Sequence, residues 1–341
     1  RMDVLREFKQ THLLRLSAAL CSNAIDVVQL GRSLSSLAET IIDEACVMAW
    51  QTLSLKYGQP EVDDTEGAIT PGFGVVAYGK LGGQEMSFNS DLDLVFIYSA
   101  VDGQTNGVKS IDTRSFYVRL AQKIIHILSV RTRTGVLYEV DMRLRPSGNS
   151  GLLVSHIEAF ADYQNNDAWT WEHQALIRAR CIQASSLLAN KFEHIRTKVL
   201  TAERDIKLLT DVKAMRKRMR DHLLKTSRDK HQFDLKQGIG GIADIEFLVQ
   251  FWVLKYASKM PDLINRTQCL TLLKALEKVP ELSNMPLGDL AEHYACLQEK
   301  VNYLALQKLP AMATITELNA EAITQVERLW LDVFGPEHEL D

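Results

Sequence analysis

Apolar residues recur at helical spacing through the first sixty residues of the chain, from Leu5 to Leu20 and again over residues 37–55. Such spacing gathers the apolar side chains on one side of a helix. Residues 59–74 are rich in Pro, Gly, Asp and Thr, which is typical of a connecting loop. We therefore predict two helices and then a loop, with the helices packed on the elements that follow.

Beyond this loop the pattern changes to one of strands. Residues 73–78 and 91–98 are short apolar runs suited to buried strands, joined by a turn rich in glycine, and residues 113–127 return to helical spacing. Residues 136–145 alternate, with apolar residues at the even positions and charged residues at every odd position from 139 onward. Because neighbouring side chains on a strand point to opposite faces, this predicts a strand with one buried and one charged face. A short strand is also predicted at residues 152–155.

The chain after Glu158 is predicted to be almost entirely helical, including single helices over residues 169–180 and 205–225. The predicted fold class is α+β, with a small mixed sheet flanked by N-terminal helices and a C-terminal helical bundle. The predicted domains are an N-terminal helical segment, a sheet-containing domain and a helical bundle, at residues 1–58, 59–185 and 186–341.

One predicted helix, over residues 205–225, carries many cations. Leu208 and Val212 begin its apolar stripe, and on this pattern the cations are expected to point outward. They are Lys213, Arg216, Lys217 and Arg220. A solvated helix face is favoured here over a docking surface for an acidic partner.

Composition narrows the function classes. The 341 residues are 46% hydrophobic and 24% charged, which is ordinary for a globular protein, and no apolar stretch is long enough to span a bilayer. The formal net charge of −4 argues against a protein that coats nucleic acid. Five scattered cysteines without a Cys-x-x-Cys spacing predict neither a zinc site nor disulfides, and so favour the cytoplasm. The chain opens on Arg1, and we expect it to be part of a longer protein.

Paired carboxylates carry the candidate chemistry. Asp91 and Asp93 are two apart at the start of a predicted strand, so both side chains point to one face. Two like charges held together repel each other unless a cation such as Mg²⁺ lies between them. Asp141 is the natural third ligand if its strand is a neighbour. Three such carboxylates can hold two metal ions about 4 Å apart for in-line displacement at phosphorus.

Glycines and cations near these carboxylates indicate a nucleotide. Gly82 and Gly83 permit a close approach of the backbone, whose N–H groups bind phosphate oxygens, and Ser90 adds a hydroxyl. Arg143 and Arg145 alternate with Asp141 and are expected to face the same cleft. The run from residue 74 to 80 has most of a Walker A spacing, but its interior is strand-like and Leu81 replaces the Ser or Thr that holds Mg²⁺. A P-loop is therefore disfavoured.

These residues resemble a known family. Residues 79–86 (Gly-Lys-Leu-Gly-Gly-Gln-Glu-Met) and 90–96 (Ser-Asp-Leu-Asp-Leu-Val-Phe) are similar to the signature of the glutamine synthetase adenylyltransferases, a branch of the DNA-polymerase-β-like nucleotidyltransferases. Residues 140–146 resemble that family's third-carboxylate strand. The full family protein has one half that removes AMP by phosphorolysis and another that attaches it. Residues 146–154 and 168–180 resemble the attaching, C-terminal half more closely.

The resemblance implies an activity and a set of roles. AMP would pass from ATP to a tyrosine hydroxyl of glutamine synthetase, with release of diphosphate, and glutamine and the PII signal protein would favour this direction. Two Mg²⁺ ions, or Mn²⁺, would be held by Asp91, Asp93 and Asp141, and Asp141 would also help to activate the hydroxyl. The triphosphate would contact Gly82, Gly83, Ser90, Arg143 and Arg145, with Arg178 and Arg180 as further candidates.

Two alternatives stay open at this point. The same carboxylates would serve the AMP-removing half, in which phosphate attacks adenylyl-tyrosine. A catalytically silent module that binds nucleotide or PII is the alternative from another class, although three intact carboxylates argue against it. Asp244 and Glu246 are expected either to cap a helix or to border the cleft.

Overall fold

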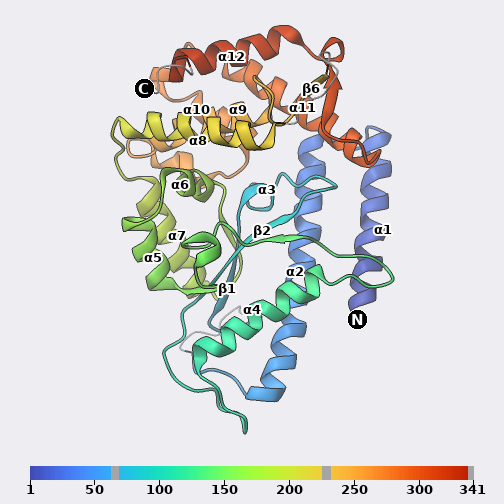
Figure 1. The fold of residues 1–341 in the computed structure, drawn as a ribbon, viewed down its shortest axis with the longest axis vertical. Helices are drawn as coiled ribbons and strands as arrows, with labels where there is room; N and C mark the ends of the chain where they lie inside the picture. Colours follow the sequence, from blue (N-terminus) through green and yellow to red (C-terminus); the bar gives the residue numbers. More distant parts are fainter. Residues whose placement is uncertain (63–68, 225–231, 337–341) are drawn as a thin grey trace. The chain divides into compact units, whose positions relative to one another are not determined.

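A computed structural model describes residues 1–62, 69–224 and 232–336 of the chain (Figure 1). The chain folds into two compact units. Unit 1 comprises residues 1–168 and 178–199, and unit 2 comprises residues 169–177 and 200–341. The N-terminal helices thus share a unit with the sheet. The domain boundaries expected after residues 58 and 185 stay predictions.

Two long helices of unit 1, α2 and α4, begin at residues whose side chains cap their first backbone N–H groups. α1 (Met2–Cys21) packs on α2 (Val27–Tyr57), which also packs on α4 (Thr113–Ser129). Asp26 and Gln29 form a reciprocal capping box at the start of α2, and the Asp112 carboxylate accepts from the N–H of Ser115 at the start of α4. The helices predicted for these segments are confirmed.

The mixed sheet of unit 1 is built around two buried strands. β1 (Phe73–Ala77) pairs antiparallel with β2 (Leu92–Tyr98) and with β5 (Arg180–Gln183), and β2 pairs in parallel with β3 (Val140–Asp141) and β4 (Val154–His156). Every residue of β1 is buried, which explains its uninterrupted apolar sequence. The remaining helices are α3 (Gly79–Gly82), α5 (Ile157–Asn166) and α7 (Ser186–Leu200), with a 3₁₀ turn, η1, at Gly148–Ser150.

Three predicted elements of this region are corrected. The strand expected over residues 136–145 is reduced to the two residues of β3, because the segment before it bonds to helices and the chain turns directly after Asp141. The glycine-rich turn after β1 is the short helix α3. The single helix expected over residues 169–180 is split into α6 (Thr170–Ile177) and β5, because β5 completes the sheet beside β1.

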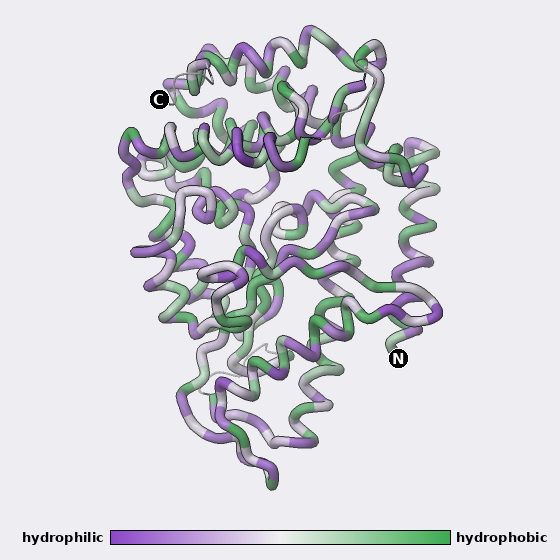
Figure 2. The backbone as a smooth tube through the Cα atoms, in the orientation of Figure 1, coloured by the Kyte–Doolittle hydropathy of each residue, from purple (hydrophilic) through white to green (hydrophobic). Residues whose placement is uncertain are grey.

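Unit 2 is a bundle of helices with one small two-stranded sheet. Its elements are α6, α8 (Lys207–Leu223), β6 (Gln232–Asp234), α9 (Ile242–Tyr256), η2 (Pro261–Asn265), α10 (Cys269–Leu276), η3 (Pro280–Leu282), α11 (Leu287–Leu306), β7 (Met312–Thr314), η4 (Ile315–Glu317) and α12 (Ala320–Phe334). α9 is buried almost all round and contacts α6, α8, α10, α11 and α12. In Figure 2, hydrophobic and hydrophilic residues alternate along α12, as expected for a helix that buries one face. The predicted bundle is therefore present, with the antiparallel pair of β6 and β7 as an addition.

The cations of α8 do not face solvent as predicted. Lys213 and Arg216 are 5% and 0% exposed, and Arg220 is 8% exposed, whereas Lys217 is exposed. Lys213 donates to the carbonyl of Pro336 at 2.7 Å. Each buried cation thus has an oxygen partner supplied from elsewhere in the bundle.

The cysteines and the long helices can be compared with what the composition predicted. All five cysteines are free thiols. Within the described ranges, no helix has the length and apolar character that crossing a bilayer requires.

Candidate active site

The pairing of β2 with β3 brings the predicted carboxylates together. Asp93 and Asp141 are register partners in this parallel pair, and the N–H of Leu92 donates to the carbonyl of Glu139 at 2.9 Å. Asp91 is the residue directly before β2. The prediction that the two strands are direct neighbours is confirmed, and segments 48 residues apart in sequence meet at one edge of the sheet.

The electrostatics of Asp93 reflect this crowding. Burial, together with the carboxylates of Asp91 and Asp141, raises the pKa of Asp93 to about 6, although Arg178 and Arg143 act in the opposite direction. A carboxyl group between two others is costly to ionise when no cation balances the charge. The three aspartates therefore form one interacting group.

Asp141 is held by the arginine two residues later. Arg143 donates to its carboxylate from the backbone N–H at 2.8 Å and from Nε at 2.7 Å and 3.0 Å, and a terminal guanidinium nitrogen completes the ion pair. These hydrogen bonds lower the pKa of Asp141. The Arg143 side chain is 74% exposed, against 15% for Asp141. Both oxygens of the carboxylate are thus covered by a group that is itself mostly in water.

Arg145 is not beside Asp141 on a strand face, because β3 ends at Asp141. Its guanidinium donates to the carbonyls of Met142 at 2.8 Å and Asn149 at 3.2 Å, and so holds the turn that follows the strand. The phosphate contacts predicted for Arg143 and Arg145 stay predictions.

Glycines allow the chain to pass closely over the carboxylates and over Arg178. Gly79 has φ +52°, and a Cβ at this position would collide with the Asp93 carboxylate. A Cβ on Gly83 would lie 2.6 Å from the guanidinium of Arg178, and one on Gly82 would collide with the Arg178 carbonyl. The N–H groups of Gly82 and Gly83 donate to Tyr78 and Gly79 within the turn of α3. These glycines serve close packing, and their predicted contact with a triphosphate stays a prediction.

Ser90 takes part in a local hydroxyl cluster. Its Oγ accepts from the N–H of Ser87 at 2.9 Å and lies 2.8 Å from the Ser87 hydroxyl, to which Lys80 donates at 3.4 Å. The cluster fixes the loop between α3 and β2, which delivers Asp91 to the site. A role of Ser90 toward phosphate stays a prediction.

Arg178 and Arg180 hold α3 in place. Arg178 forms an ion pair with Glu85 in which the two side chains are only 7% and 13% exposed. Arg180 donates to the carbonyls of Gly82 at 2.7 Å and Leu81 at 3.1 Å and pairs with Glu39. Sequence reasoning treated both arginines as phosphate ligands and missed their supporting role. Arg178 lies in the turn before β5 and Arg180 is the first residue of that strand, so no local pattern in the sequence indicated this role.

The donor chemistry of this site fits a hard divalent cation. Asp91, Asp93 and Asp141 supply carboxylate oxygens, which Mg²⁺ and Mn²⁺ prefer, and burial with two neighbouring carboxylates raises the pKa of Asp93. Over the described part of the chain, no three acidic, histidine or cysteine side chains are already gathered as a ligand set.

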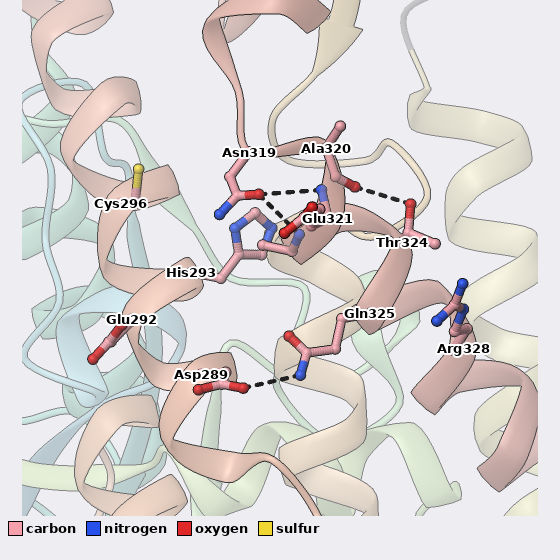
Figure 3. Close-up of a pocket in the computed structure, with 11 residues that line it drawn as sticks. Asp289, Glu292, His293, Cys296, Asn319, Ala320, Glu321, Thr324, Gln325 and Arg328 are labelled. Atoms are coloured by element: carbon pink, nitrogen blue, oxygen red, sulfur yellow. Dashed lines mark hydrogen bonds between the residues drawn. The ribbon is translucent and has the colours of Figure 1, made fainter.

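Unit 2 has a hollow of its own, between α11 and α12 (Figure 3). Its volume is about 1020 Å³. Gln325 donates to Asp289 across it at 3.1 Å, and the Asn319 side chain caps α12 at one end. The buried His293 lies 3.2 Å from the carbonyl of Gly240, and burial lowers its pKa. The lining is polar and internally hydrogen-bonded, and it includes none of the three aspartates.

Asp244 lies in the interior of unit 2. One of its oxygens accepts from Arg216 at 2.6 Å and from Arg220 at 3.0 Å, and the other accepts from the N–H of Gly240 at 2.7 Å. Arg216 also donates to Gln237. Asp244 lies in the first turn of α9, and the N–H that it binds belongs to Gly240, before the helix begins, so it does not cap the helix. It is instead the centre of a buried charge cluster.

The mixed sheet with helices around it and the aspartates at its edge define a nucleotidyltransferase-like α+β protein. The family model for glutamate-ammonia ligase adenylyltransferase matches residues 1–195. This is more than half of the chain, and the chain belongs to that family. Residues 210–329 match the family model for PII-uridylyltransferase, so most of the helical unit is similar to part of that second kind of enzyme.

Proposed function

We propose that this chain transfers AMP from ATP to a tyrosine hydroxyl of glutamine synthetase, the enzyme also called glutamate-ammonia ligase, and releases diphosphate. The hydroxyl oxygen forms a bond to the α-phosphorus while the bond from that phosphorus to the diphosphate oxygen breaks. The observation that carries the proposal is the register of Asp93 against Asp141, with Asp91 two residues before Asp93. Family membership supports adenylyl transfer in general.

Asp91, Asp93 and Asp141 would hold the divalent ions. When bound, these ions supply charge neutralisation on the phosphates and lower the pKa of the attacking hydroxyl. A tyrosine hydroxyl has an ordinary pKa of about 10, so it is a poor nucleophile at neutral pH unless a carboxylate or a cation assists it. Asp141 is the carboxylate proposed to assist, on the family resemblance and because it is the register partner of Asp93.

Arg143 has two partners in this proposal. In the structure it covers Asp141, and its largely exposed side chain would be able to turn toward the phosphates if Asp141 held a cation. Gly79 keeps the backbone close to Asp93, so a phosphate can approach the carboxylates without meeting a side chain at that position.

The attaching direction, rather than the removing one, is proposed on the resemblance of residues 146–154 and 168–180 to the attaching half. Regulation by PII is proposed for unit 2, because residues 210–329 match the PII-uridylyltransferase model. Glutamine as an effector and the cytoplasm as location are carried over from the same resemblance.

The test uses the whole chain, unmodified glutamine synthetase and ATP labelled at its α-phosphate. Label on a synthetase tyrosine supports the proposal. Phosphate-dependent release of AMP as ADP from adenylylated synthetase, with no labelling in the forward test, would instead identify the removing half. Nucleotide binding with neither reaction would identify a silent module. Asp102→Asn, which neutralises an exposed carboxylate of the same unit, is the matched control for substitutions of the three aspartates.

A further inference from the structure

The chain reaches β3 through an irregular segment, residues 130–138, which we name the approach segment. It follows α4, and its own regular structure is one isolated bridge between Thr132 and Gly135. β3 itself pairs with β2 over two residues only. A pairing this short is weak, and a slip of one residue would turn Asp141 to the opposite face of the sheet. Something outside the strand must therefore fix the register.

Helix α1 supplies these fixing contacts through a buried arginine. Arg6 is 1% exposed, and its guanidinium donates to the carbonyls of Gly135 at 2.8 Å and Val130 at 2.5 Å, on either side of the Thr132 position. A third bond goes to the carbonyl of Met2 within α1. The planar guanidinium thus ties both ends of the turn to the helix, which an ammonium group cannot do with the same geometry.

A second cation of α1 holds the segment closer to the strand. The Lys9 ammonium donates to the carbonyl of Leu137 and lies 3.6 Å from the ring centroid of Tyr138. Burial lowers the pKa of Lys9 to about 8, so the fold keeps this ammonium in a costly position for the sake of its contacts. Leu137 is three residues before Val140, the first residue of β3.

Exposed polar contacts complete the attachment. The Asp3 carboxylate accepts from the hydroxyls of Thr132 at 2.8 Å and Thr134 at 2.9 Å, and Gln10 donates to the carbonyl of Thr134 at 2.9 Å. The side chains of residues 3, 6, 9 and 10 lie on one face of α1 at helical spacing, so a single helix face is devoted to this segment.

We propose that α1 is a positioning element for the carboxylate site, with Arg6 and Lys9 as positioning residues that keep Asp141 in register with Asp93. The proposal rests on the proposed function for its catalytic meaning. Its structural content stands apart from that function, because it concerns the pairing of β2 with β3.

The test reads that pairing directly. The N–H of Leu92 donates to Glu139 across the two strands, so its amide hydrogen exchange reports whether β3 is docked. In the metal-free whole chain, Arg6→Ala is expected to speed exchange at Leu92 at least tenfold relative to buried amides of β1. Lys9→Met, which keeps the apolar stem, is expected to speed it about threefold, and Arg6→Lys is expected to lie between the wild type and Arg6→Ala.

The control is Leu20→Ala, at a buried position fourteen residues along α1 from Arg6, which is roughly 21 Å along the helix axis. It lowers the melting temperature, but it is expected to leave the ratio of exchange at Leu92 to exchange in β1 within twofold of the wild type. If Leu20→Ala speeds amide exchange at Leu92 relative to β1 as much as Arg6→Ala does, α1 stabilises the unit only in general, and the proposal is overturned. Unchanged exchange in both Arg6→Ala and Lys9→Met would overturn it as well.

Calorimetric titration with Mn²⁺ tests whether the register of β3 affects binding at the carboxylate site. Arg6→Ala is expected to weaken Mn²⁺ binding at least tenfold, with Leu20→Ala within twofold of the wild type. If the wild type binds no Mn²⁺, the proposed function fails while the exchange experiment still decides the role of α1. If Mn²⁺ binds equally well to the wild type and to Arg6→Ala despite faster exchange, Asp141 does not depend on α1 and the positioning role is refuted.

Discussion

Two aspartate–arginine clusters, one in each unit, use the same chemical groups in opposite environments. Asp141 and Arg143 lie at the sheet edge of unit 1, where the arginine side chain is 74% exposed. Asp244 and Arg216 lie inside unit 2, where both side chains are 1% exposed and Arg220 adds a second cation. The exposed arginine can exchange its partner for water or a ligand at little cost, whereas the buried ones cannot. The difference in burial therefore distinguishes the exposed cluster, which can bind a ligand, from the buried cluster, which supports the fold.

The neighbours of each cluster reinforce this difference. Asp244 has an arginine and a backbone N–H on its two oxygens, so its charge is fully compensated. Asp93, beside Asp141, is buried next to two carboxylates, and this burial and the two neighbouring charges raise its pKa to about 6. A fold that leaves a carboxyl group in that condition is disposed to bind a cation.

The largest expected effect is on catalysis. Asp93→Asn should lower AMP transfer to glutamine synthetase at least a thousandfold, or about 4 kcal/mol and more in activation free energy, because a central metal ligand is lost. The same change should not lower the free energy of unfolding, since it removes a crowded charge. Transfer of labelled AMP and urea unfolding measure the two quantities. More than a tenth of wild-type activity in Asp93→Asn would remove Asp93 from the catalytic centre.

The next effect is on the buried cluster. Asp244→Asn should lower the free energy of unfolding by about 3 kcal/mol, because the buried Arg216 and Arg220 lose their ion pairs with the Asp244 carboxylate. The amide keeps one acceptor, which places the cost at the lower end of the range for broken buried pairs. Asp141→Asn is the matched control in the exposed cluster, with an expected loss below about 1 kcal/mol. Equal losses for the two variants would abolish the distinction between the clusters.

A smaller effect depends on pH. The pKa of Asp93 is about 6 in the folded chain, above its value of 3.8 without perturbation, so the folded state binds this proton more tightly. Its contribution to stability is fully present below about pH 4 and is lost as the pH rises through 6. Between pH 4 and pH 7 the metal-free wild type should lose about 2 kcal/mol relative to Asp93→Asn, with solvent screening included. Parallel stability curves for the two proteins over this range would show that Asp93 is not crowded.

Helices and strands could be predicted where the local sequence alone shows which side chains are buried. The helices α2 and α4 and the buried strands β1 and β2 follow from apolar spacing and capping residues. The shared face of Asp91 and Asp93 follows from the two-residue period of a strand. That Asp141 lies beside Asp93 depends on the pairing of β3 with β2, which the sequence alone does not determine. The alternation of charged residues around Asp141 only led us to expect it.

Elements that depend on distant partners could not be predicted. Residues 136–145 alternate like a strand, but Leu137 is buried out of phase with that pattern and its carbonyl is held by Lys9. Arg216 and Arg220 carry charges that a helical pattern places in water, and they are buried because Asp244 lies opposite them. In each case a contact between segments far apart in sequence overrides the local pattern.

The smallest expected effect separates the two clusters most sharply. Arg143→Ala should change the free energy of unfolding by less than about 1 kcal/mol, because the exposed guanidinium exchanges its carboxylate for water. A double-mutant cycle of Arg143→Ala with Asp141→Asn should give a coupling energy below about 1 kcal/mol, whereas the cycle of Arg216→Ala with Asp244→Asn should give about 3 kcal/mol. Urea unfolding of the wild type, the single variants and the two double variants measures both. A strong coupling between residues 141 and 143 would mean that Arg143 is a fixed part of the fold, and a cation would then have to overcome that coupling before it could reach Asp141.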